Sequence, residues 1–203
     1  HHQLCRDLLE GALGQWPQAR ELHRLLIDAC TRLGDEAGAI AAVERLVLLD
    51  EDDAAPWIEL SSLRQGVGDL DLAIRAAQHA IRCDDTWSTW QRLAVLQEQN
   101  EDSRTAAVAY RNALRSGGDW SCRYGLAMVL VDRQDQIDEV VDLLRETAAD
   151  PNSPPRVAMA LTTQLVRADR QVEAAQVVRE LLAEDDLNDD MRRQAEQLLA
   201  GLE

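Results

Sequence analysis

The sequence predicts an all-α protein, a right-handed α-solenoid built of antiparallel helix pairs. Residues 33–43 return in a looser form as residues 67–77, 34 positions further along the chain. Trp57 and Trp90 stand 33 positions apart, and a Leu follows each of them after three positions. The apolar residues, 46% of the chain, are mostly Ala, Leu and Val, which favour helices. A period of about 34 residues is typical of stacked helix pairs.

The first helices follow from the spacing of apolar residues and from the residues that end each stretch. A helix is expected over residues 3–13, with four leucines on one face: Leu4, Leu8, Leu9 and Leu13. Pro17 stands beyond its end, where the residue before a proline avoids helical geometry. A second helix over residues 19–33 ends at Gly34, a residue common just after a helix. A third, over residues 36–49, directs four apolar side chains inward: Ile40, Val43, Leu46 and Val47.

The same alternation continues along the chain, without the period-two pattern of strands. Further helices are expected at residues 55–66, 70–82, 87–100, 102–115, 120–133, 137–149, 155–168, 171–184 and 189–202. The connections between them are short, so consecutive helices should be antiparallel neighbours.

The charge of the chain limits the partners that it can bind. The formal net charge is −16, and Arg supplies the fixed positive charge because Lys is absent. Such a surface repels phosphate backbones and anionic lipids, which argues against nucleic-acid binding. We therefore expect a neutral or basic protein or peptide as partner. No apolar run is long enough to span a bilayer, so no direct membrane insertion is expected. The expected location is the cytoplasm, or the periplasm if a longer form carries an N-terminal signal or anchor.

Sequence motifs of catalysis, cofactor binding and metal binding are absent. The chain has no HExxH, GxSxG, P-loop or dinucleotide-binding pattern, so it is not expected to be an enzyme or to hold a cofactor. Its cysteines show neither metal-ligand nor disulfide spacing: Cys5, Cys30, Cys83 and Cys122. We expect these cysteines as small core residues in a reducing compartment.

Five segments in phase share a pattern of large, small and glycine positions, and they begin near Arg20, Ala54, Trp87, Trp120 and Pro155. The second segment matches at Trp57, Leu60, Ser61, Gly68, Ala73 and Ala80. The third matches at Trp90, Leu93, Ala94, Ala106, Tyr110 and Ala113. This pattern resembles the tetratricopeptide repeat (TPR) family of 34-residue helix–turn–helix units.

The resemblance implies a single array over residues 1–203 with about five repeats and flanking helices. Residues 3–19 look like the second helix of a preceding repeat, as if the chain were cut from a longer array. The repeats are expected near residues 20–53, 54–86, 87–119, 120–154 and 155–187. Residues 188–203 are expected to form a capping helix, because an apolar stripe faces a polar one there.

The resemblance also implies a function. In TPR proteins the first helix of each pair lines a concave groove that holds peptides or partner segments, so a non-enzymatic interaction scaffold is expected. The residues that the resemblance places in the groove are Arg24, Asp28, Arg32, Ser62, Gln65, Gln91, Val95, Glu98, Gln99, Tyr124, Met128, Met159, Thr163 and Arg167. The Lys and Asn residues of co-chaperone TPR domains, which grip a carboxylate, are missing at these positions.

Two alternatives stay open at this point. The chain could be the recruiting arm of a larger enzyme, for example a glycosyl- or sulfotransferase, whose catalytic domain lies outside it. It could also self-associate as a homo-oligomer, through the first helix or the groove.

Charged and aromatic residues near the repeat boundaries are expected to have structural roles. Acidic clusters precede helix starts and would cap them: residues 50–53, 84–85, 184–186 and 189–190. Trp57 and Trp90 are expected in the packing, whereas three others could form an exposed contact patch: Trp16, Trp87 and Trp120. We expect His23 in the core and His79 on an outer face.

Overall fold

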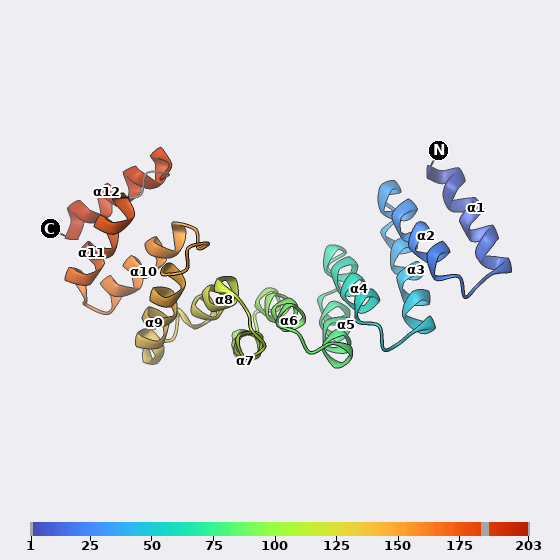
Figure 1. Ribbon diagram of the computed structural model, residues 1–203, viewed down its shortest axis with the longest axis horizontal. Helices are drawn as coiled ribbons and strands as arrows, with labels where there is room; N and C mark the ends of the chain where they lie inside the picture. Colours follow the sequence, from blue (N-terminus) through green and yellow to red (C-terminus); the bar gives the residue numbers. More distant parts are fainter. Residues whose placement is uncertain (1, 184–186, 203) are drawn as a thin grey trace. The chain divides into compact units, whose positions relative to one another are not determined.

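The computed structural model describes residues 2–183 and 187–202, and folds them into helices and turns without a strand (Figure 1). The helices are α1 (His2–Gln15), α2 (Arg20–Leu33), α3 (Glu36–Leu49), α4 (Ala54–Gly66), α5 (Leu70–Cys83), α6 (Trp87–Gln99), α7 (Ser103–Arg115), α8 (Trp120–Leu130), α9 (Ile137–Ala148), α10 (Arg156–Arg167), α11 (Gln171–Leu182) and α12 (Asp189–Leu202). A 3₁₀ turn, η1 (Gln134–Gln136), separates α8 from α9. The predicted all-α class is confirmed.

The helices form two compact units, residues 1–102 with α1 to α6 and residues 103–203 with α7 to α12. Within each unit every helix packs against the next one along the chain. The pairs α2–α3 and α4–α5 correspond to the first two expected repeats, and α8–α9 and α10–α11 to the last two. Consecutive packed helix pairs are the solenoid arrangement that the sequence predicts.

The turn inside a helix pair repeats a single hydrogen-bond pattern. Gly34 has a φ of 70°, and around it the amides of Gly34 and Asp35 donate to the carbonyls of Thr31 and Cys30. Gly68, with a φ of 81°, lies in the same pattern one repeat later. These bonds satisfy carbonyls that a helix end leaves without partners, and the left-handed residue between them suits glycine.

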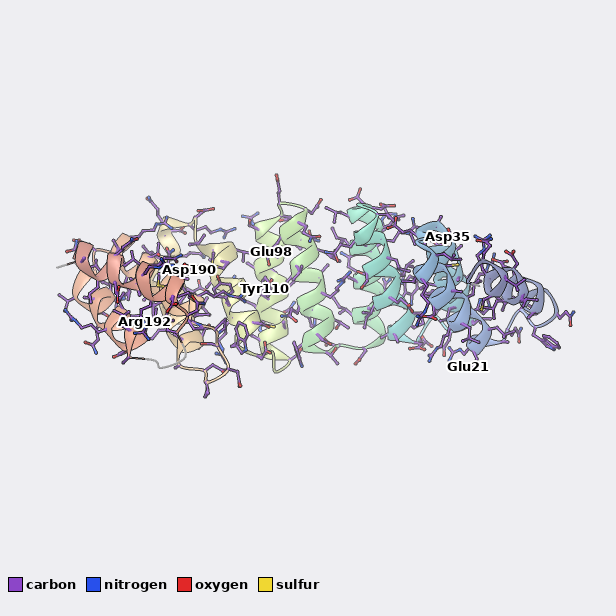
Figure 2. All side chains as sticks on the ribbon, turned by 90° about the horizontal axis from the view of Figure 1, so that it is seen from above. Glu21, Asp35, Glu98, Tyr110, Asp190 and Arg192 are labelled. Atoms are coloured by element: carbon purple, nitrogen blue, oxygen red, sulfur yellow. The ribbon has the colours of Figure 1, made fainter. Side chains whose placement is uncertain are left out.

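Asp35, which Figure 2 labels, stands at the start of α3 and shows how an acidic residue before a helix acts. The carboxylate of Asp35 accepts the amide of Gly38 at 2.9 Å and the guanidinium of Arg6 at 2.9 Å. These two hydrogen bonds lower the pKa of Asp35. The residue therefore caps α3 and also ties it to α1.

Small residues recur where the second helix of a pair approaches the first. The side chains of Ala39, Ala73, Ala106 and Ala174, at the same position of four expected repeats, are completely buried. A small side chain there lets the two helices lie close together. Large buried residues fill other positions, as Tyr110 and Leu144 do.

Two expectations for the helices and their side chains need correction. Helix α8 ends at Leu130 and not at residue 133, because the amide of Arg133 turns back to the carbonyl of Leu130 in a tighter bond. The leucine face of α1 is only partly covered: Leu9 and Leu13 are buried, whereas Leu4 and Leu8 are 62% and 66% exposed.

The cysteines fit the core only in part. Cys30 and Cys122 are buried, Cys83 is half-buried, and Cys5 is exposed, so the core assignment is wrong for Cys5. Burial raises the pKa of the Cys122 thiol to about 11, which keeps it protonated and unreactive at neutral pH.

Candidate binding surfaces

The outward face of α2 carries three of the residues expected in a groove. Arg24, Asp28 and Arg32 are exposed and follow one another at intervals of one turn. The Nε atom of Arg32 donates to both carboxylate oxygens of Asp28, at 2.9 and 2.8 Å. Arg24, on the other side of Asp28, makes no hydrogen bond or ion pair with another described side chain. Of the two cations, Arg24 is therefore the one that can reach a ligand without first breaking a bond.

A hollow of about 340 Å³ lies beside Arg24, between α2, α3 and α4. Its lining comprises Arg24, Ile27, Leu46, Ala55, Pro56 and Glu59. Removal from water raises the pKa of Glu59, an effect that the nearby charge of Arg24 partly offsets. The hollow thus has an apolar floor and one charged group of each sign. The sequence prediction missed Glu59, which is not among the residues that the resemblance places in the groove.

The faces of α4 and α6 meet through an amide pair. The Nε2 atom of Gln65 donates to Oε1 of Gln99 at 2.7 Å, which links neighbouring repeats. The hydroxyl of Ser62 donates to the carbonyl of Ile58 in its own helix at 3.0 Å. Val95 is 36% exposed on α6, and Gln91 and Glu98 are half-buried on the same helix. The unit therefore presents amides interleaved with aliphatic groups.

In the second unit the expected groove residues lie on α8 and α10. The guanidinium of Arg156 stands 5.7 Å from the ring centroid of Tyr124, within range of a cation–π contact. Arg167 donates to the carbonyl of Val131 at 2.9 Å and so joins α10 to the end of α8. Met128 is 37% exposed. These residues form a mixed apolar and polar surface.

Two of the expected residues on α10 have structural contacts. The hydroxyl of Thr163 donates to the carbonyl of Met159 at 3.0 Å. Met159 is half-buried and packs against the core cluster that includes Val178 and Leu181. Of this pair, Thr163 is the more exposed and the more available to a ligand.

The acidic clusters act at the repeat boundaries, although not all of them as caps. Asp53 accepts the amide of Ala55 at the start of α4, as expected. Helix α6, however, is capped by Thr86 through a capping box, and not by the acidic pair before it. Asn188 accepts the amide of Met191 at the start of α12. The cluster at residues 184–186 lies outside the described residues.

The tryptophans and histidines partly follow expectation. His23 is buried, and its Nε2 atom lies 2.8 Å from the carbonyl oxygen of Pro17. Trp57 is half-buried and stacks on His79, so His79 is not on a free outer face. The three boundary tryptophans do not share one exposure: Trp16 is 60% exposed, and Trp87 and Trp120 are half-buried.

Among the described side chains, those of residues 3–183 and 187–202, no group of three or more His, Cys, Asp or Glu is arranged to hold a metal ion. A search of the same residues finds no helix with the length and apolarity that crossing a membrane requires.

Comparisons with known proteins concern the fold. No family model and no curated protein matches the sequence. The structure is similar to that of MamA, with a TM-score of 0.71 and 16% identity over 83% of this chain and 96% of that one. It is similar to YrrB, described as a TPR protein with an unusual peptide-binding site, with a TM-score of 0.71 and 11% identity over 93% and 97%. Yeast Tom70 matches with a TM-score of 0.66 and 16% identity over 97% of this chain and 42% of Tom70. At these identities the likeness shows the fold, which is that of TPR proteins.

Proposed function

We propose that this chain, which has the fold of TPR proteins, is an interaction module that holds a segment of a partner protein on the exposed faces of its first helices. The hollow beside Arg24 carries the proposal. It lies against α2 and α4, the first helices of two consecutive repeats, and combines an apolar floor with Arg24 and Glu59. Such a site suits an extended segment with both hydrogen-bonding and apolar groups.

The charge of the chain supports a neutral or basic partner. At a net charge of −16 an acidic segment would be repelled before it made contact. A basic or neutral segment would place a cationic or amide group near Glu59, while Arg24 donates to a main-chain carbonyl of the segment. Its apolar side chains would cover Ile27 and Pro56 in the floor.

The similarity to YrrB, whose description includes a peptide-binding site, favours the same class of ligand here. A recruiting role within a larger enzyme would use the same surface, so the proposal covers both contexts. Nothing in the described residues favours a catalytic role over this one.

The test starts from a ligand selected against the chain itself. A phage-displayed random peptide library is panned on the 203-residue chain, and the affinity of the best synthetic peptide is measured by calorimetry. Ala55→Trp fills the hollow, and Arg24→Glu reverses its cation. Each is expected to weaken binding about tenfold or more, or about 1.4 kcal/mol.

Matched controls carry the same changes on exposed second-helix positions. Ala37→Trp lies on α3 and Arg75→Glu on α5, and both should leave the affinity unchanged. If the two hollow variants bind the selected peptide as tightly as the controls do, the first-helix face is not the binding surface.

A further inference from the structure

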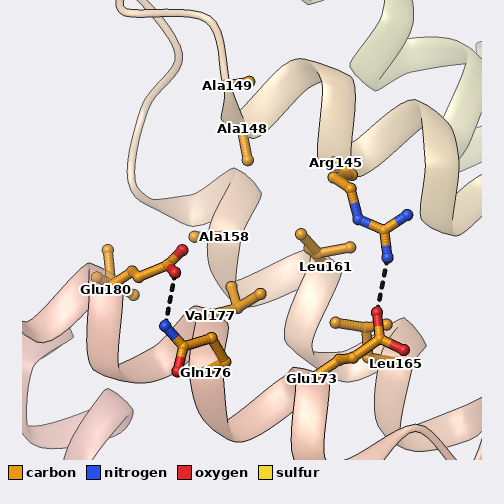
Figure 3. A pocket seen from close by; sticks show the side chains of 11 residues that line it. Arg145, Ala148, Ala149, Ala158, Leu161, Leu165, Glu173, Gln176, Val177 and Glu180 are labelled. Carbon is orange, nitrogen blue, oxygen red and sulfur yellow. Dashed lines mark hydrogen bonds and ion pairs between the residues drawn. The ribbon is translucent and has the colours of Figure 1, made fainter.

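A hollow in the second unit lies between α9, α10 and α11 (Figure 3). Its volume is about 400 Å³. Leu161, Leu165 and Leu181, each almost fully buried, lie at its base, and Ala158 and Val177 form its walls. The base of the hollow is therefore apolar and belongs to the buried core. We call this hollow the α9–α11 cavity.

The position of Ala158 in its repeat explains why the cavity exists. Counted from the start of each expected repeat, Ala158 stands at the fourth position, which Trp57 and Trp90 occupy in the second and third repeats. In the second repeat the indole of Trp57 stacks on His79 of α5 and packs against the core of the first unit. The residue equivalent to His79 in the last repeat is Glu180, which lines the cavity.

The same chain thus shows what fills this space when it is occupied. In the second repeat, where the fourth residue is Trp57, the indole ring covers the imidazole of His79 on α5. Where it is Ala158, the corresponding volume is left between α9 and α11. The apolar side chains at the base of the hollow lack dispersion contacts on the side that faces the empty space. A flat aromatic ring placed there would supply those contacts.

Charged groups on the rim of the cavity determine which charge a ligand should carry. The guanidinium of Arg145 donates to Glu173 at 2.9 Å (Figure 3). The guanidinium of Arg170 donates to the same carboxylate at 2.6 and 2.7 Å. Glu180 accepts only the neutral amide of Gln176, at 2.7 Å, and no cation among the described residues pairs with it. The cavity therefore offers one carboxylate that a cation from outside can neutralise.

We infer that the α9–α11 cavity is a second docking site, which takes a tryptophan side chain of a partner protein with an arginine or lysine next to it in sequence. The ring would lie over Ala158 and Val177, in the place that Trp57 fills in its own repeat. The neighbouring cation would pair with Glu180. Aromatic and Arg side chains are also the residues that most often anchor protein interfaces.

This site is independent of the first-helix surface. Ala158, Leu161 and Leu165 line one side of α10. Met159 and Thr163 lie on another side of the same helix, about 100° and 140° around the axis from Ala158 at 100° per residue. Each site can therefore be occupied or lost without the other.

The experiment uses a small probe and methyl NMR of the whole chain. Acetyl-Trp-Arg-amide is titrated, and the methyl signals of Ala158, Leu161 and Val177 should shift saturably, whereas that of Met128 should not. Acetyl-Ala-Arg-amide, which lacks the ring, should leave all of them unchanged. Acetyl-Trp-Glu-amide should bind more weakly because its carboxylate meets Glu180.

Two variants separate the ring from the charge. Ala158→Trp supplies the missing ring from within the chain, and it should abolish the shifts at Leu161 and Val177. Glu180→Gln should reduce the affinity for acetyl-Trp-Arg-amide about two- to fivefold, the range of an exposed ion pair, and remove the preference over acetyl-Trp-Glu-amide. Ala55→Trp, in the hollow on the first-helix face, should change neither result.

Three results would overturn the inference: no saturable shift at the cavity methyls of the unmodified chain, equal shifts with the probe that lacks the ring, or unaltered binding to a folded Ala158→Trp variant. The first result needs no variant, so the test does not depend on how Ala158→Trp folds. Failure here leaves the first-helix surface untouched, because that surface is tested with its own peptide and variants.

Discussion

The indole of Trp57 and the imidazole of His79 stack with their ring centroids 4.2 Å apart and their planes 15° from parallel. The Nε1 atom of Trp57 also donates to the carbonyl of Glu51 at 3.0 Å, which fixes the orientation of the ring. Burial lowers the pKa of His79, and the positive charge of Arg82 lowers it further, against a smaller opposite effect of Glu51. The second repeat thus holds a histidine that favours its neutral form.

This lowered pKa predicts a pH dependence of stability. Below the ordinary histidine value of 6.5 the unfolded chain binds a proton at His79 more readily than the folded chain. The stabilisation is therefore fully present above about pH 6.5 and is lost as the pH falls through the folded pKa. Between about pH 7.5 and pH 5.5, the free energy of unfolding measured with urea should fall more for the unmodified chain than for His79→Gln. An equal loss of unfolding free energy in His79→Gln would mean that His79 does not contribute to the pH dependence. If an NMR titration gave His79 a raised pKa, a cation–π contact with Trp57 would outweigh the effect of burial.

Among the described residues, Glu101 and Asp169 occupy the left-handed position of an inner turn although they are not glycines, which predicts a stabilising substitution. Glu101 has a φ of 56°, and the amide after it donates to the carbonyl of Gln97 at 2.9 Å, as in the Gly34 and Gly68 turns. Glu101→Gly should raise the free energy of unfolding by about 0.5–1 kcal/mol, because glycine adopts this conformation without strain. Asn100→Gly, one residue earlier at a φ of −83°, is the matched control and should not stabilise. Equal changes in both thermal midpoints would contradict the explanation.

A glycine in α8 predicts the reverse of the usual glycine effect. A Cβ atom added to Gly125 would lie 2.5 Å from Cε1 and 2.6 Å from the hydroxyl oxygen of the buried Tyr110. Gly125→Ala should therefore destabilise by about 1–3 kcal/mol, since the buried ring would have to shift to admit the added methyl group. Gly11→Ala in α1, where nothing lies within 4 Å, should instead stabilise by about 0.5–1 kcal/mol through helix propensity. Thermal unfolding of both variants tests the contrast, and the same sign for both would refute it.

The repeat pattern predicts the helices well because the residue at each of its positions reflects how closely two helices pack there or how the chain turns between them. Buried Ala39 and Ala73 stand where the pattern calls for small residues, and Gly34 stands where it calls for a left-handed turn. The early end of α8 was less predictable: its turn at residues 131–133 contains no glycine, and it ends through local hydrogen bonds that periodicity does not encode.

The candidate sites were only partly predictable for a related reason. The repeat pattern places both Arg24 and Arg32 in the expected groove and does not distinguish them. In the structure Asp28 binds Arg32, because an acid four residues nearer the helix N-terminus is the favourable order for such a pair. The hollow beside Arg24 needs three helices to form. The α9–α11 cavity arises because Ala158 is smaller than the residues at the same position of other repeats. A comparison with the repeat pattern looks for residues that match it, so it does not single out a position where the residue is too small.

The close approach of α4 and α5 gives the last prediction. Ala73 is completely buried on α5, at the position that brings the two helices of the second repeat together. Ala73→Leu adds three carbon atoms where the packing leaves no space, so it should lower the free energy of unfolding by about 1–3 kcal/mol. Gln78→Leu, on the exposed side of α5, makes a similar apolar addition without crowding and should change stability by less than about 0.5 kcal/mol. Urea unfolding of the two variants separates crowding between the helices from added hydrophobicity: an unchanged midpoint for Ala73→Leu would mean that α5 does not pack on α4 through this residue, and that the assignment of repeat positions is shifted.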